Sequence, residues 1–160
     1  MTASRVKRLV GTMVAVAVGV AVAAAPSPGR AVMTADLAKV ELMLHGVTAV
    51  YASAVMTMQA YRAGLLTKEE ASTEIGRNER FLTVLTKCGK TLEREAAPGD
   101  DENVSLAKDF LQVCSYLELA LGSFEDFVSD GNDIDRKLVD RYLFKCEQTM
   151  TRLLRNFSGE

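Results

Sequence analysis

The sequence predicts an all-α protein, an antiparallel up-down four-helix bundle preceded by a cleavable N-terminal signal peptide. Hydrophobic residues make up 48% of the 160 residues, and the chain has only 3 Pro and no Trp. Ala, Leu, Val, Glu and Lys are common, and most of these residues favour helix. Apolar residues also recur at spacings of three and four in four successive segments. The connections between these segments are short, so helices that are adjacent in sequence should pack side by side.

The first 31 residues have the order of a secretory signal peptide and short linker. A basic start is followed by the apolar run Leu9–Ala25 and then by Pro26–Gly29. We expect cleavage before Pro26, around Ala23–Ala24, or later, near Ala31. The mature protein would then be exported, either periplasmic or secreted. An uncleaved membrane anchor is the alternative, because a run of about 17 residues is at the lower end of the spanning range.

The charge balance of the mature chain excludes some partner classes. Removing Arg5, Lys7 and Arg8 leaves 16 basic residues against 21 acidic ones, a net charge of −5. A mildly acidic protein has no basic field that would attract a phosphate backbone. We therefore expect no nucleic-acid partner and no membrane contact beyond the signal segment.

The first helix of the bundle domain, which spans residues 32–160, is expected over residues 34–63. Thr34 is a suitable N-cap, and Gly64 provides the left-handed position after the last turn. Between them, Leu42–Tyr61 has no formal charge when His45 is neutral, so other helices should cover it. Its expected core stripe is Leu37, Val40, Leu44, Val47, Tyr51, Val55 and Met58.

The second helix is expected over residues 67–96. Thr67 and Glu70 have the spacing of a capping box, in which each side chain bonds the backbone amide of the other residue. Gly89 falls near the apolar stripe, where the absence of a side chain permits close approach of a neighbouring helix. The stripe is Ala71, Ile75, Leu82, Leu85 and Leu92.

The third and fourth helices are expected over residues 102–129 and 133–157. Asp130–Asp133, with a glycine at its second position, has the residues of a tight turn between them. The third stripe is Ala107, Phe110, Cys114, Leu117, Leu121, Phe124 and Val128. The fourth is Leu138, Tyr142, Cys146, Met150 or Thr149, Leu153 and Phe157.

The three cysteines lie at similar heights on three different helices. Cys114 and Cys146 are each 16 residues from Asp130, the centre of the last turn, and Cys88 and Cys114 are each 13 residues from Asp101. Because exported proteins meet an oxidising compartment, we expect a Cys114–Cys146 disulfide, worth on the order of 3–4 kcal/mol. A Cys88–Cys114 disulfide is the second option. Three buried free thiols are the alternative to both.

A metal site is a further hypothesis. His45 lies near the height of Cys88, Cys114 and Cys146, and one histidine with three cysteines is the composition of a tetrahedral zinc site. However, His45 points about 130° away from the mean direction of its own stripe, at about 100° per residue. We therefore expect no metal and no other cofactor.

Three apolar residues point away from the stripes of their helices and form a candidate partner surface. These residues are Met56, Leu119 and Phe144. Leu119 and Phe144 lie on adjacent helices at similar heights, where they could join into one patch. An exposed apolar patch favours a protein partner or a homodimer.

The sequence therefore predicts an exported, non-enzymatic helical bundle that binds a partner protein or a small ligand, in one version as a homodimer. A metal- or thiol-redox protein using the cysteine layer is one alternative, and a membrane-anchored bundle with an uncleaved N-terminal helix is another. An enzyme has no positive support among the residues, because His45 is the only histidine available as a base and no phosphate-binding loop is present.

Overall fold

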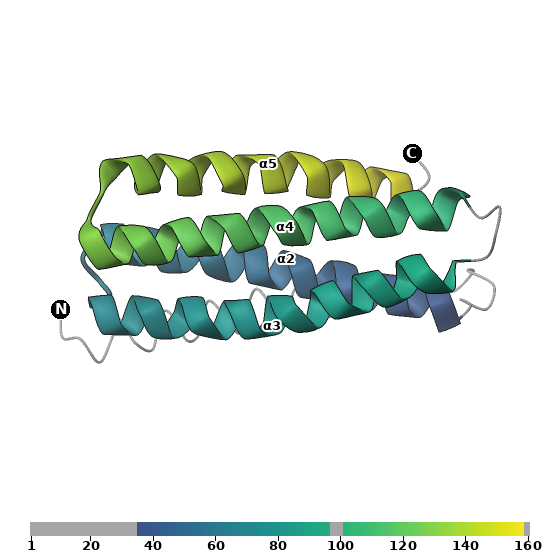
Figure 1. The fold of residues 1–160 in the computed structure, drawn as a ribbon, viewed down its shortest axis with the longest axis horizontal. Coiled ribbons are helices and arrows are strands. Elements are labelled where there is room, and N and C mark those ends of the chain that lie inside the picture. Colours follow the sequence, from purple (N-terminus) through teal and green to yellow (C-terminus); the bar gives the residue numbers. More distant parts are fainter. Residues whose placement is uncertain (1–34, 97–100, 159–160) are drawn as a thin grey trace.

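Four long helices packed side by side make up the computed structural model, which describes residues 35–96 and 101–158 (Figure 1). The helices are α2 (Ala35–Arg62), α3 (Lys68–Glu95), α4 (Asp101–Asp130) and α5 (Asp133–Ser158). Each runs antiparallel to the helix before it (Figure 1). The predicted all-α four-helix fold is confirmed, and the observed helix bounds lie within one residue of the expected ones. The predicted signal peptide lies outside the described residues.

The predicted signals at the α2–α3 connection are present. Gly64 has a φ of +67°, which only glycine adopts at little cost. Thr67 Oγ1 accepts a hydrogen bond from the Glu70 amide at 3.2 Å, and Glu70 Oε2 accepts one from the Thr67 amide at 3.1 Å. The capping box is therefore complete and fixes the start of α3.

The turn between α4 and α5 is held by two side-chain contacts. Gly131 has a φ of +73°. Asp130 Oδ1 accepts a hydrogen bond from the Asn132 amide at 2.9 Å, and Asn132 Oδ1 accepts one from the Ile134 amide at 3.0 Å. These bonds satisfy one backbone amide in the turn and one in the first turn of α5, as expected of Asp and Asn at such positions.

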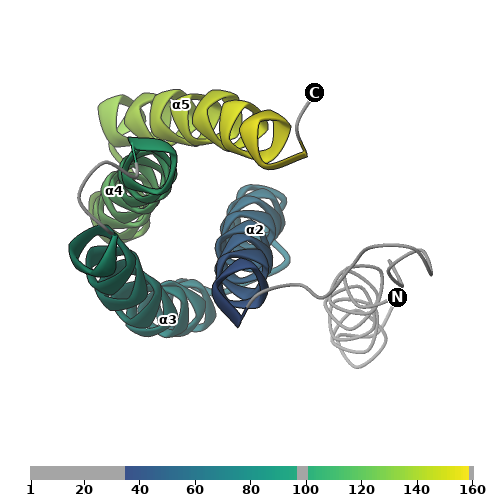
Figure 2. The same ribbon diagram turned by 90° about the vertical axis from the view of Figure 1, so that its right-hand side faces the viewer.

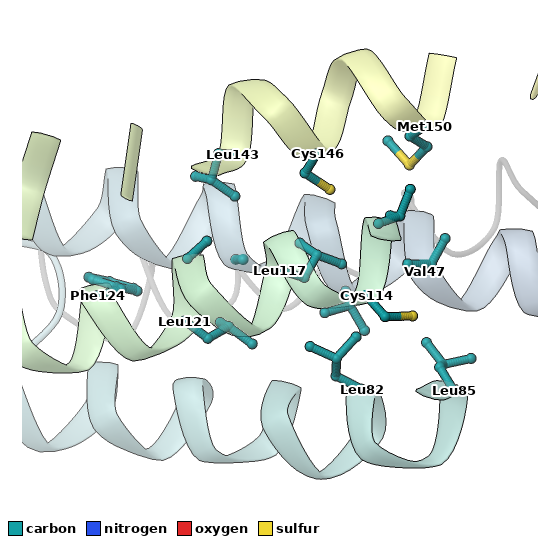
Figure 3. Packing of buried hydrophobic residues seen from close by; sticks show 14 of the residues in the cluster. Val47, Leu82, Leu85, Cys114, Leu117, Leu121, Phe124, Leu143, Cys146 and Met150 are labelled. Atoms are coloured by element: carbon teal, nitrogen blue, oxygen red, sulfur yellow. The ribbon is translucent and has the colours of Figure 1, made fainter. Parts of the chain in front are cut away.

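The hydrophobic core lies along the middle of the bundle and takes residues from all four helices. Val47 of α2, Leu117 of α4 and Leu153 of α5 have no exposed surface. Figure 3 shows part of this core, with Leu117, Leu121 and Phe124 of α4 lying among side chains of the other helices. The ring of Tyr61 meets Phe124 edge to face at a centroid distance of 6.0 Å, which joins α2 to α4.

The four helices do not contact one another equally. Seen from the end of the bundle, α3, α4 and α5 form an arc and α2 lies in its opening (Figure 2). The most extensive packing joins α4 to α5, whereas α2 packs mainly on α3 and touches α4 and α5 less. As a result, α2 has the least support from its neighbours.

Polar contacts hold α5 to the helices on either side. On the α4 side, Arg152 pairs with Asp109 at 2.6 Å. On the α2 side, Arg62 pairs with Asp140 at 3.1 Å, and the Thr48 hydroxyl donates to the sulfur of Met150 at 3.6 Å. The polar contacts between α2 and α5 therefore include one ion pair and one hydroxyl–sulfur contact, among the few contacts that join these two helices.

Candidate functional site

The cysteines are all free thiols in the structure, so neither predicted disulfide is present. Cys114 and Cys146 are buried, and Cys88 is exposed. The expectation from equal heights was wrong because height alone does not fix direction. Burial raises the pKa of the Cys114 thiol, and the nearby side chain of Thr86 on α3 offsets part of that rise. The sulfur of Cys114 points away from Cys146 (Figure 3), toward the side of Leu85.

Burial lowers the reactivity of the two core thiols, those of Cys114 and Cys146. Burial raises the pKa of Cys114 to about 11. Burial also raises the pKa of Cys146 to about 12, and the charge of the nearby Cys114 adds a smaller contribution to that rise. A thiol attacks disulfides and binds metals as the thiolate, which these values make rare at neutral pH. The two residues therefore pack as small hydrophobic side chains.

The four residues of the hypothetical zinc site are not brought together. The side chain of His45 is 45% exposed, and its Nε2 lies 3.8 Å from Glu41 Oε1, one turn earlier on α2. Cys88 faces solvent, while Cys114 and Cys146 lie in the core. Among the described residues, no three or more His, Cys, Asp or Glu side chains converge as metal ligands would.

The outward residues predicted from the helical stripes have different environments. Leu119 is 45% exposed and Phe144 is 58% exposed, whereas Met56 is half-buried. Next to Phe144 in sequence, Lys145 of α5 has its Nζ 5.5 Å from the ring centroid of Tyr116 of α4. Leu119 and Phe144 are therefore both exposed on adjacent helices, and the patch expected from joining them stays a prediction.

A different apolar surface lies where α2 meets α3. Gly46 marks the close approach of the two helices, because a Cβ there would lie 2.8 Å from Leu85 Cδ2. One turn before Gly46 on the same face is Leu42, which is 73% exposed, and one turn after it is the exposed Ala49.

The facing side of α3 continues this surface. Phe81 lies one turn before Leu85, and Val84 directly precedes it. Since α2 and α3 are antiparallel, Phe81 lies opposite Ala49. Phe81 is 48% exposed and Val84 is 53% exposed. We call this surface the α2–α3 strip, formed by Leu42, Ala49, Met56, Phe81 and Val84.

Basic side chains border the strip on α3. Arg80 and Lys87 lie one turn on either side of Val84, and both are exposed. Neither belongs to any ion pair in the described part of the chain, whereas the neighbouring Arg77 pairs with Glu74 at 2.8 Å. The α2 side has no formal charge from Leu42 to Tyr61 when His45 is neutral.

The opposite edge of α3 is acidic. Glu79 faces α4, and burial, followed by the charges of Glu125 and Glu118, raises its pKa. Carboxylates therefore gather where α3 meets α4, while the basic residues lie beside the strip. The two edges of α3 have opposite electrostatic character.

Only Met56 of the strip was among the predicted partner residues. Leu42, Phe81 and Val84 were missed because the expectation selected residues opposite the stripes, and these three flank them. A signal was present in the sequence, since Leu42–Tyr61 has no polar face to offer solvent. One described stretch, Lys39–Arg62, is long and apolar enough to cross a membrane by length and composition, a criterion that the core helix of a soluble protein also meets.

No protein family matches this chain, and neither does a curated protein or a solved structure.

Proposed function

We propose that this chain is an exported helical-bundle module, without catalytic activity of its own, that binds a partner protein through the α2–α3 strip. The observation that carries the proposal is the exposure of large apolar side chains on two adjacent helices. Leu42, Phe81 and Val84 are each about half exposed or more. Contiguous apolar surface of this kind favours a contact that the single chain does not make.

The chemistry of the other candidate residues supports a binding role over a redox or metal role. The pKa values of Cys114 and Cys146 are raised to about 11 and about 12, so their thiolates are scarce near neutral pH. His45 is the only histidine in the chain and is separated from these cysteines. The properties of Cys114, Cys146 and His45 therefore favour binding through the protein surface as the function.

Photo-crosslinking in the producing cells tests the proposal. A photoreactive phenylalanine analogue is placed at Phe81 in one variant and at Leu119 in another, with similar exposures of 48% and 45%. We expect the variant at position 81 to yield a discrete adduct with a second protein, identified by mass spectrometry, and the variant at position 119 to yield much less. An absence of protein adducts at both positions would refute a protein-binding role.

The same cells test export. Fractionation and N-terminal sequencing should recover the protein outside the cytoplasm, beginning at or after Ala23. Recovery in the membrane fraction with residues 1–31 attached would instead identify the anchored alternative. Recovery in the cytoplasm with an intact N-terminus would contradict export.

A further inference from the structure

We propose that the α2–α3 strip docks an amphipathic helix of the partner whose apolar stripe is flanked by acidic residues. This inference rests on the proposed function and adds the chemistry of the partner to it. Its basis is the spacing of the apolar line on α2, the absence of formal charge from Leu42 to Tyr61 when His45 is neutral, and the basic border on α3.

The apolar part of the strip has the spacing that an α-helix can match. Leu42, Ala49 and Met56 are seven residues apart, which places them in a line along α2 that drifts only slowly around it. At about 1.5 Å per residue, the line is about 21 Å long, or about four helical turns. A partner helix of similar length, with apolar side chains at i, i+3, i+4 and i+7, would cover it.

The positive charges of Arg80 and Lys87 beside the strip favour acidic residues on the flanks of the partner helix. Arg80 and Lys87 are also seven residues apart, so they form a basic line parallel to the apolar one. Both are exposed and have no ion-pair partner in the described part of the chain. Glu or Asp side chains at matching intervals on the partner would meet these two cations. Complementary charge of this kind contributes specificity and association rate more than affinity.

A second copy of this chain fits the strip less well. In a two-fold dimer the same surface appears on both sides of the interface. Arg80 and Lys87 of each copy would then lie at the edge of an interface to which Leu42–Tyr61 contributes no carboxylate. The basic border would be left without complementary charge, so an isologous dimer through the strip is disfavoured.

An anionic lipid surface is also a weaker fit. The mature chain has an expected net charge of −5, and within residues 35–96 and 101–158 the exposed cations that border the strip are Arg80 and Lys87. Membrane-surface helices instead carry many basic residues along a polar face. Lipid binding is therefore an outcome of the test that would overturn the proposal.

Fluorescence anisotropy with two defined peptides tests the proposal on the protein as purified from its producing cells. One labelled peptide, about 18 residues long, has leucines at alternating spacings of three and four and glutamates on the flanks. The other has lysine at every glutamate position. We expect the acidic peptide to bind at least about tenfold more tightly, and this advantage to shrink at about 0.5 M salt.

Three variants locate the contact. Phe81→Asp should weaken binding of the acidic peptide at least about tenfold, and Arg80→Glu with Lys87→Glu should reverse the preference toward the lysine peptide. Leu119→Asp is the matched control, at similar exposure on α4, and should leave binding unchanged. All these sites are exposed, and urea unfolding of each variant checks that a loss of binding does not reflect a loss of folding.

The exposed thiol of Cys88 gives a second readout. Cys88 lies one turn after Val84 on α3, so a docked helix should slow its reaction with a thiol reagent. Equal binding of both peptides, binding of neither, or loss of binding in Leu119→Asp would overturn the proposal. So would tighter binding to anionic vesicles than to the acidic peptide, or a dimer that Phe81→Asp dissociates. If adducts form at position 81 in cells while the acidic peptide fails to bind, the proposed function stands and the partner chemistry is wrong.

Discussion

The first and last of the four helices, α2 and α5, both pack on the same core, but their sequences differ in how much apolar surface they leave outside it. In α5, buried residues such as Val139, Cys146 and Leu153 form one stripe, and charged residues occupy much of the remaining surface. In α2, apolar residues lie on the outer side of the helix as well as on the core side, yet only 33% of its most apolar stretch is buried. Core packing explains most of the pattern of α5, where Ile134, Phe144 and Leu154 are exposed exceptions, and it explains less of the pattern of α2. The excess apolar surface of α2 is what points to a partner.

Substitution of a core phenylalanine should have the largest effect. Phe124 is 1% exposed and its ring contacts Tyr61 of α2, so Phe124→Ala should lower the free energy of unfolding by about 3–5 kcal/mol. Phe144→Ala is the matched control, because Phe144 is 58% exposed on α5. It should cost less than about 1 kcal/mol in urea unfolding. Similar losses in both variants would mean that exposure does not distinguish core from surface here.

Alkaline pH should weaken the α4–α5 half through its buried thiols. Folding raises the pKa of Cys114 to about 11 and of Cys146 to about 12, from 9.0 for a free thiol. The folded chain therefore holds protons that the unfolded chain releases above pH 9. The associated stability is complete below about pH 9 and is lost as pH rises toward 12, on the order of a few kcal/mol.

Urea unfolding across this pH range measures the effect. The double variant Cys114→Ala and Cys146→Ala should show a flatter decline than the natural chain. Part of the decline should remain, because burial also raises the pKa of Tyr51. An unchanged slope in the double variant would show that the thiols do not control it.

Two glycines of α3 should respond to alanine in opposite directions. A Cβ at Gly89 would lie 2.8 Å from Phe110 Cδ1 and 2.9 Å from Leu111 Cδ2, so Gly89→Ala should destabilise by about 1–3 kcal/mol. At Gly76 no atom lies within 4 Å of such a Cβ. Gly76→Ala should therefore stabilise by up to about 1 kcal/mol, through helix propensity. Stabilisation by both changes in thermal unfolding would disprove the close α3–α4 approach.

The smallest expected effect belongs to the ion pair at the α4–α5 contact. Arg152 and Asp109 are 2.6 Å apart, but the side chain of Arg152 is 55% exposed. Solvent screening therefore limits Arg152→Ala to less than about 1 kcal/mol, and added salt should reduce the difference further. A loss comparable to that of Phe124→Ala would show that the pair, and not the core, secures α5.

Local signals predicted the fold well because each acts over a few residues. The capping box of Thr67 and Glu70, the turn at Gly131 and the close approach at Gly89 are all present. The errors arose where direction across two helices decides the outcome. Cys114 and Cys146 share a height, yet the sulfur of Cys114 points away from Cys146 (Figure 3).

The candidate site was predictable only in part, for a related reason. A single helix shows which residues flank its stripe, but not which neighbouring helix reaches them. Leu42 and Phe81 flank the stripes of their own helices and are both exposed, on either side of the place where the Leu85 side chain packs on Gly46. Met56 was placed outward and is half-buried. The pairing of the two flanks into one strip depends on the packing of the helices.

The most direct test of an uncovered outer face on α2 compares two substitutions five residues apart on that helix. Urea unfolding is measured for Val47→Asp and Leu42→Asp in the same chain, since Val47 has no exposed surface and Leu42 is 73% exposed. A buried unpaired carboxylate should cost Val47→Asp at least about 3 kcal/mol, while Leu42→Asp should stay within about 0.5 kcal/mol of the natural chain. An equal loss in Leu42→Asp would show that another part of the chain covers this face, and it would remove the basis for a partner there.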